Sequence, residues 1–120
     1  MTPAAAIYNF LSGFGLTAYE VNSVPENDEM PYLTYDPVID YWQNETVLQV
    51  NLWYRGTENT VPNAKAKEIG DALNGGKILP CEGGAIWVKR GTPFVQSMAD
   101  QNDASIKRRY INLSTEFLTQ

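Results

Sequence analysis

Residues 46–55 read TVLQVNLWYR and decide the fold. The apolar side chains of Leu48, Val50 and Leu52 alternate there with those of Gln49 and Asn51. Because successive side chains of an extended chain point to opposite sides, this period of two predicts a β-strand with one face in a hydrophobic core. The rest of the chain must then supply partner strands and a cover for that apolar face.

A second extended segment comes directly before this strand. Residues 32–42 are rich in aromatic and β-branched side chains, and the polar residues 43–45 separate them from residues 46–55. Both features are typical of neighbouring strands joined by a short connection. The two segments therefore predict an antiparallel hairpin.

A short amphipathic helix is predicted at the N-terminus. Apolar residues recur at helical spacing over residues 4–14, directly after Thr2 and Pro3, which suit a helix N-cap and a first helical position. Glycines near the end of this stretch turn the chain without steric cost. Residues 16–21 then predict a first, short strand.

The second part of the chain predicts one helix and three strands. Helical periodicity returns over residues 60–73, and two glycines follow it. Residues 85–90, 94–98 and 106–118 read as strands, and the polar residues 99–103 read as a hairpin tip before the last one.

The expected fold follows from this order of elements, α-β-β-β-α-β-β-β. Most connections are too short for crossover helices, which favours an antiparallel or mixed sheet. The two helices should pack on one face of that sheet, which gives an α+β fold. A chain of 120 residues is the size of one domain, so we expect residues 1–120 to form a single unit.

Charge is divided unevenly along the chain. The first 54 residues contain no Lys or Arg, and their seven acids are Glu20, Glu26, Asp28, Glu29, Asp36, Asp40 and Glu45. Residues 55–120 hold all nine bases against seven acids, so the two parts carry formal charges of −7 and +2 and the chain carries −5. This asymmetry indicates a molecule with sided surfaces and favours partners over a buried reaction centre.

The residue types exclude most catalytic chemistry. The chain has no His and one Cys, Cys81. Without an imidazole no Ser-His or Cys-His pair can form, and the usual ligands of a zinc site are missing. We therefore expect that the protein is not an enzyme and that it holds no metal centre and no cofactor. The lone Cys81 suits a reducing cytosol, and no apolar run approaches the roughly 18 residues that span a membrane.

Two groups of acids are candidates for a site. Glu26, Asp28 and Glu29 lie in a predicted loop whose spacing matches no EF-hand, so a solvated loop is favoured over a calcium site. Asp36 and Asp40 are four residues apart and share one face of the predicted strand. That pair could act as a general acid and base, but surface charges on a hairpin are the simpler interpretation.

The bases cluster at residues 89–90 and at Lys107, Arg108 and Arg109. Strand alternation sends Arg108 to one face and Lys107 with Arg109 to the other. A nucleic-acid footprint would need one face and a basic balance. Two further interpretations are edge-strand charges that prevent aggregation and contacts with the acidic half of a neighbouring copy.

The order of features resembles the tail terminator, or tail completion, family of head-tail joining proteins of long-tailed bacteriophages. The resemblance extends over nearly the full length and is carried by the helix AAAIYNFL at residues 4–11 and the strands MPYLTY at 30–35 and VNLWYR at 50–55. The helix AKAKEIGDAL at residues 64–73 and the terminal strand YINL at 110–113 complete it.

The resemblance implies a structural virion protein at the tail–head junction, made in the host bacterial cytoplasm. Its implied partners are copies of itself in a ring, which is a hexamer in this family, the tail tube protein and the head connector or stopper protein. DNA would pass through the ring without sequence-specific binding, and no membrane is involved. The alternative is another head-tail connector component, or a small monomeric or dimeric adaptor that binds through its acidic loop.

A cyclic ring brings different patches of neighbouring copies together, so the divided charge gains a meaning. The candidate contacts with a neighbouring subunit or the channel are Glu26, Asp28, Glu29, Asp36, Asp40, Lys107, Arg108 and Arg109. Exposed Trp42 and Trp53 are the candidates for contact with the tail tube, although core packing would explain at least one of them equally well.

Overall fold

The structure is a computed structural model that describes residues 1–36 and 45–119. Its elements are α1 (Pro3–Ser12), β1 (Ala18–Glu20), β2 (Tyr32–Tyr35), β3 (Thr46–Arg55), α2 (Thr60–Ala72), β4 (Lys77–Cys81), β5 (Gly84–Ala99) and β6 (Ile106–Thr119). The predicted order α-β-β-β-α-β-β-β and the α+β class are confirmed.

The six strands form one mixed sheet in the order β1-β2-β3-β6-β5-β4. β1 runs parallel to β2, and every other pairing is antiparallel. β6 pairs with β3 along the whole of β3, from Thr46 opposite Thr115 to Arg55 opposite Ile106, and it pairs with β5 on its other side. The predicted hairpin is confirmed where the structure describes it, since Tyr32 pairs with Trp53.

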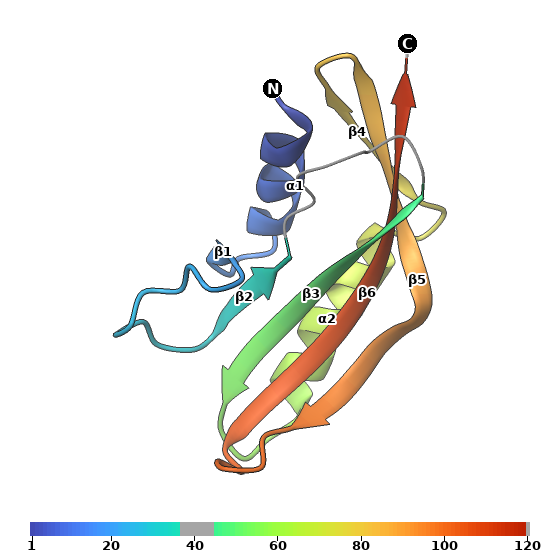
Figure 1. The fold of residues 1–120 in the computed structure, drawn as a ribbon. Helices are drawn as coiled ribbons and strands as arrows, with labels where there is room; N and C mark the ends of the chain where they lie inside the picture. The colour runs from blue at the N-terminus through green and yellow to red at the C-terminus, as the bar shows by residue number, and fades with distance from the viewer. Residues whose placement is uncertain (37–44, 120) are drawn as a thin grey trace.

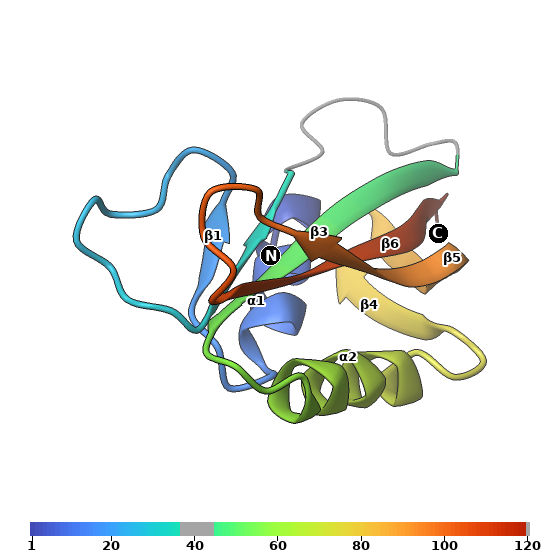
Figure 2. The ribbon, with the colours of Figure 1, turned by 90° about the horizontal axis from the view of Figure 1, so that it is seen from below.

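Both helices lie on one face of the sheet, as expected. Figure 2 shows α1 and α2 on the same side, and Figure 1 shows α2 running along β3, β6 and β5. The sheet is curled, so α1 contacts both of its outer strands, β1 and β4. The Glu82 amide after β4 also donates to the Met1 carbonyl at 2.7 Å, which ties the N-terminus to the far edge of the sheet.

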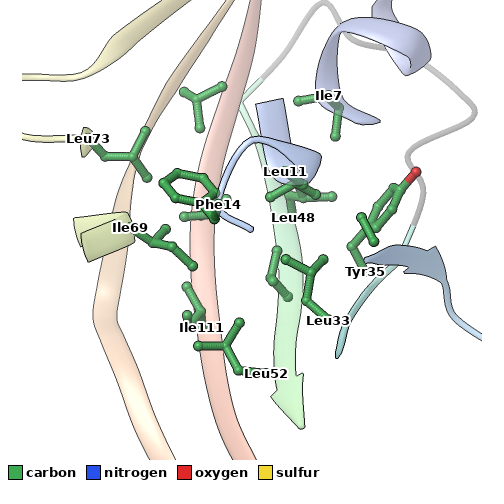
Figure 3. Close-up of a cluster of buried hydrophobic side chains, with 14 of the residues drawn as sticks. Ile7, Leu11, Phe14, Leu33, Tyr35, Leu48, Leu52, Ile69, Leu73 and Ile111 are labelled. Atoms are coloured by element: carbon green, nitrogen blue, oxygen red, sulfur yellow. The ribbon is translucent and has the colours of Figure 1, made fainter. Parts of the chain in front are cut away.

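The core fills the space between the helices and the sheet (Figure 3). Leu48 and Leu52 of β3 and Ile111 of β6 are fully buried, which confirms the alternation read from residues 46–55. Leu11 of α1 and Ile69 of α2 meet them from the helix side. The opposite face of the sheet has no helix over it in the described part of the chain.

The predicted helix ends are close to those observed. The Thr2 hydroxyl accepts a hydrogen bond from the Ala5 amide at 3.1 Å, which confirms Thr2 as the N-cap of α1. The ends of α2 and β6 differ from the predicted ones by one residue. Local signals of capping and periodicity were therefore sufficient to predict the ends of these elements.

The strands around residue 85 differ from the prediction. Residues 85–90 and 94–98 belong to one strand, β5, whose register against β6 shifts between Arg90 and Val95. Gly91 and Pro93 look like a break in the sequence, but a bulge accommodates them, and the Asn112 side-chain amide donates to the Pro93 carbonyl at 3.0 Å.

The prediction also missed β4. Pro80 argues against a strand because proline has no amide hydrogen for a sheet ladder. β4 is an outer strand, and on the side without a neighbour that amide is not needed. The prediction of two strands within residues 85–98, and of none between the second helix and residue 85, is therefore wrong, although the number of strands is unchanged.

Side-chain hydrogen bonds fix the tip between β5 and β6, which the polar residues 99–103 predicted. The Asp103 carboxylate accepts from Arg55 Nη1 at 2.6 Å, from the Ser105 hydroxyl at 2.6 Å and from the Ser105 amide at 2.9 Å. These bonds, the Ser105 hydroxyl first, lower the pKa of Asp103 to about 2. Bonds to the charged form favour it, so the tip depends on ionised Asp103.

We predict that Asp103→Asn destabilises the protein at neutral pH and that the loss disappears in acid. The folded-state pKa lies below the unfolded value of about 3.9, so the stabilisation is present above that pH and is lost as the pH falls toward 2. Urea unfolding at a series of pH values measures the difference. Asp36→Asn, a change at an exposed carboxylate without an ion pair in the described part, is the matched control; a pH-independent Asp103 effect would contradict this account.

Candidate functional site

Acidic side chains gather at the β1–β2 end of the sheet. Glu26, Asp28 and Glu29 lie exposed in the loop between these strands, and Asp36 is exposed directly after β2. The Tyr19 hydroxyl of β1 hydrogen-bonds Asp28, and this bond is the main cause that raises the pKa of Tyr19. We call residues 21–31 the acidic loop.

None of the four ion pairs among the described residues includes a residue of the acidic loop. Arg55 pairs with Asp103, Lys65 with Glu68, Lys67 with Asp71, and the N-terminal amine with Glu82. Every acid in these pairs comes from residues 55–120. The described acids of the first 54 residues are therefore not compensated within the chain.

Five bases lie on two other strands of the sheet. Lys89 and Arg90 lie on β5, and Lys107, Arg108 and Arg109 lie on β6. None of these five forms an ion pair with a described residue. Figures 1 and 2 both place the acidic loop on one side and β5 on the other. The acidic loop and the bases of β5 are thus separated in space. The bases of β6 lie between them, opposite the end of β3 that pairs with β2.

The predicted alternation of the basic run is confirmed. Arg108 points to the face without helices, where its Nε donates to Asn51 Oδ1 at 2.7 Å. Arg109 points to the other face and bonds two side chains of the α2 region. Lys107 is half-buried, and its Nζ donates to the Ala104 carbonyl at 2.8 Å.

Arg108 is the centre of a cluster that we call the aromatic face. Its guanidinium carbon lies 5.0 Å from the ring centre of Trp53 and 5.7 Å from that of Tyr110, within the range of cation–π attraction. Trp53 Nε1 donates to the Thr34 hydroxyl at 2.9 Å. Trp53 is half-exposed and lies on the face of the sheet that no described helix covers, so it does not belong to the core. Trp42, like Asp40, lies among residues 37–44, outside the described residues.

Arg109, one of the expected subunit contacts, is buried in the fold. Only 4% of its surface is exposed, and its guanidinium donates to Asn63 at 2.8 Å, to Asn59 at 2.9 Å and to the Arg108 carbonyl at 3.2 Å. All three acceptors are neutral, and burial lowers the pKa of Arg109. Arginine nevertheless stays charged in proteins. Arg109 therefore has hydrogen-bond partners inside the fold, and its contact with a neighbouring subunit stays a prediction.

A groove of about 340 Å³ lies between α2 and β5, and we call it the α2–β5 groove. It is lined by Asn63, Ala66, Lys67, Gly70, Asp71, Arg90, Phe94, Val95, Ser97 and Arg109. Gly70 lets the Phe94 ring approach the helix, because a Cβ at this position would lie 2.9 Å from the ring. The groove thus combines guanidinium groups with an apolar wall, a combination that suits carboxylate-bearing peptide segments.

The other candidates offer less chemistry. Cys81 is half-buried at the end of β4, and burial raises the pKa of its thiol, which disfavours the reactive thiolate. In residues 1–36 and 45–119 no three His, Cys, Asp or Glu side chains come together as a metal site would need. Asp36 is exposed, but its proposed partner Asp40 is outside the described residues. No helix in the same ranges is long and apolar enough to cross a membrane.

In comparisons with known proteins, no family model, no curated protein and no solved structure matched this chain.

We predict that Asn63→Ala destabilises the protein by about 1–2 kcal/mol, because it leaves a buried N–H of Arg109 without its acceptor. Alanine also favours the helix more than asparagine does, so the measured loss is a lower bound. Asn74→Ala is the control, since Asn74 is exposed and accepts only from exposed Arg90 at 3.3 Å, and it should change stability by no more than about 0.5 kcal/mol. Equal losses in urea unfolding would show that Arg109 does not depend on Asn63.

Proposed function

We propose that this chain assembles with copies of itself into a ring that ends a bacteriophage tail tube and joins it to the head connector. The observation that carries this proposal is the position of uncompensated charge. Exposed acids without ion pairs lie at the β1–β2 end of the sheet, and bases without ion pairs lie on β5 and β6.

The acidic loop and the bases of β5 lie on opposite sides of the sheet, and this arrangement favours one mode of self-association. The acidic side of one copy attracts the basic side of the next, and the pairing leaves the same two sides free for further copies. Such head-to-tail contacts give a closed ring when the rotation between copies closes. The family that the chain resembles implies six copies.

The resemblance supplies the place of this ring. Segments 4–11, 50–55 and 64–73, on which the resemblance rests, lie in or overlap α1, β3 and α2. By analogy the ring would sit at the tail–head junction of the virion, after synthesis in the host cytoplasm. Its neighbours there would be the tail tube protein and the connector or stopper protein.

Acids that do not meet a neighbouring copy have a further use in a ring. Asp36 and Glu45 are exposed and form no ion pair among the described residues. On the wall of a channel, such carboxylates would repel the phosphates of DNA and keep the DNA moving. Salt limits this repulsion to about 8–10 Å, so it requires a narrow channel.

The aromatic face suits the contact with the tail tube. Trp53, Arg108 and Tyr110 lie together on the side of the sheet that no described helix covers. Tryptophan, tyrosine and arginine are the residues that most often dominate the energy of protein interfaces. Arg108 belongs to this face, whereas Arg90 of β5 lines the groove on the helix side and would remain for a neighbouring copy.

We predict that the purified protein forms an oligomer whose association weakens as salt is raised. Increasing the ionic strength from about 0.05 M to 0.5 M shortens the range of electrostatic attraction, so the mass measured by light scattering should fall at a fixed protein concentration. A monomer at every concentration would contradict self-assembly and favour the adaptor alternative. Association that is insensitive to salt would mean that apolar contacts dominate.

We predict that Trp53→Ala forms rings but caps tail tubes about tenfold less well, because it removes the largest side chain of the aromatic face. Electron microscopy of tail tubes mixed with the variant counts the capped ends. Tyr8→Ala is the control, since Tyr8 is an exposed aromatic residue on α1. Normal capping by Trp53→Ala would exclude the aromatic face as the tube contact.

A further inference from the structure

We infer that the acidic loop of one copy docks in the α2–β5 groove of the next copy. This inference rests on the proposed self-assembly and names its contact. It commits to a second copy of this chain as the occupant of the groove, and to Glu26 and Glu29 as the carboxylates that enter it.

The groove contains a buried cation without a counter-ion. Arg109 lines it, and its three hydrogen-bond partners are neutral oxygen atoms. A guanidinium carries five N–H donors, so this group retains donors beyond the three bonds. A buried charge is costly unless it is paired, and its field is weakly screened. Docking of a carboxylate nearby would therefore stabilise Arg109.

The rim of the groove adds accessible charge. Arg90 is exposed, and among the described residues its side chain forms one hydrogen bond, the 3.3 Å contact with Asn74. Lys67 pairs with Asp71 at 2.7 Å, but both side chains are largely exposed, so the pair is weak and can exchange partners. Arg90 is thus the first group that an incoming carboxylate would meet.

The walls of the groove are apolar. Phe94 is half-buried against Gly70, and Val95 is 39% exposed although it lies on the helix side of the sheet. The C-terminal part of β5 is exposed on the helix side of the sheet, because α2 leaves it partly uncovered. An occupant with apolar residues next to its acids would cover this surface.

The acidic loop has that composition. It carries Glu26, Asp28 and Glu29 within four residues, with Val24 before them and Met30 after them. Asp28 is held by the Tyr19 hydroxyl, which leaves the two exposed glutamates for a partner. A nucleic-acid phosphate would also suit the guanidinium groups, but the chain charge of −5 opposes its approach.

The loop of a molecule does not fill its own groove. Figures 1 and 2 place the loop beyond β1, on the side of the sheet away from β5, and residues of β5 and α2 line the groove. The contact therefore joins two different patches of neighbouring copies. Repetition of such a contact produces the head-to-tail order that a ring needs.

Two charge-reversal variants test the contact. Arg90→Glu changes the groove, and the double variant Glu26→Lys with Glu29→Lys changes the loop. Each should weaken self-association at least about tenfold in sedimentation velocity, because like charges then face each other. Arg90→Ala only removes the charge and should weaken self-association severalfold. It replaces Arg90→Glu in the test if Arg90→Glu does not fold.

The controls carry the same charge changes elsewhere. Lys77→Glu alters an exposed base of β4, away from the groove and outside the basic residues of β5 and β6. Glu58→Lys with Glu82→Lys alters two exposed acids outside the acidic loop. Both controls should associate within about twofold of the unmodified protein, since neither touches the groove or the acidic loop.

Mixing provides the sharpest outcome. In a mixture of Arg90→Glu with the double loop variant, each loop meets a groove of opposite charge, so oligomers of alternating copies should form although neither variant assembles alone. If the unmodified protein assembles and the groove and loop variants assemble equally well, the docking contact is wrong while self-assembly stands. If the unmodified protein stays monomeric, both proposals fail. Loss of assembly without rescue on mixing also overturns the docking contact.

Discussion

The pairing of β3 with β6 is the constraint on which the rest of the structure depends. Its register places Leu52 opposite Arg109 and Trp53 opposite Arg108. A slip of one residue would exchange the two faces, moving the core side chains into water and Trp53 under the helices. The hydrophobic pattern of β3 and β6 prevents that slip. The same register therefore fixes the core, the aromatic face and the buried position of Arg109.

Local signals were enough for part of this fold. The alternation in β3, the N-cap Thr2 and the period of α2 act within a few residues, and the sequence shows them directly. The opposite directions of Arg108 and Arg109 follow from the period of a strand. The sequence was misread at β4 and β5, because the structure of these strands depends on their place in the sheet. Pro80 is tolerated because its strand is at the edge, and the bulge after Arg90 matches β6 rather than any local pattern.

The candidate site was harder to predict, because its contacts join distant parts of the chain. Arg109 reaches Asn63 across 46 residues and Asn59 across 50, and a run of three bases in a sequence looks exposed. The stacking of Arg108 with Trp53 likewise requires the register of two strands. The acidic loop was visible in the sequence as a solvated segment. The groove was not, because it forms only where α2 leaves β5 uncovered.

The ion pairs explain why the charge remains divided. Two of the four join residues three or four apart on α2, and such exposed pairs contribute little to stability. Bases in the second half of the chain thus use acids from the same half. The acids of the first half form no ion pair among the described residues, and we propose that the groove of a second copy offers them bases.

The central claim is that the acidic loop and the α2–β5 groove of different copies meet. Cross-linking tests it most directly, with Glu29→Cys in one protein and Arg90→Cys in another, both with Cys81→Ser. Mixed under oxidising conditions, the two should form a disulfide-linked heterodimer much faster than either forms a homodimer. Efficient formation of homodimers by the Glu29→Cys protein alone would contradict this contact. The absence of a cross-link between the two proteins, in a sample that assembles, would contradict it as well.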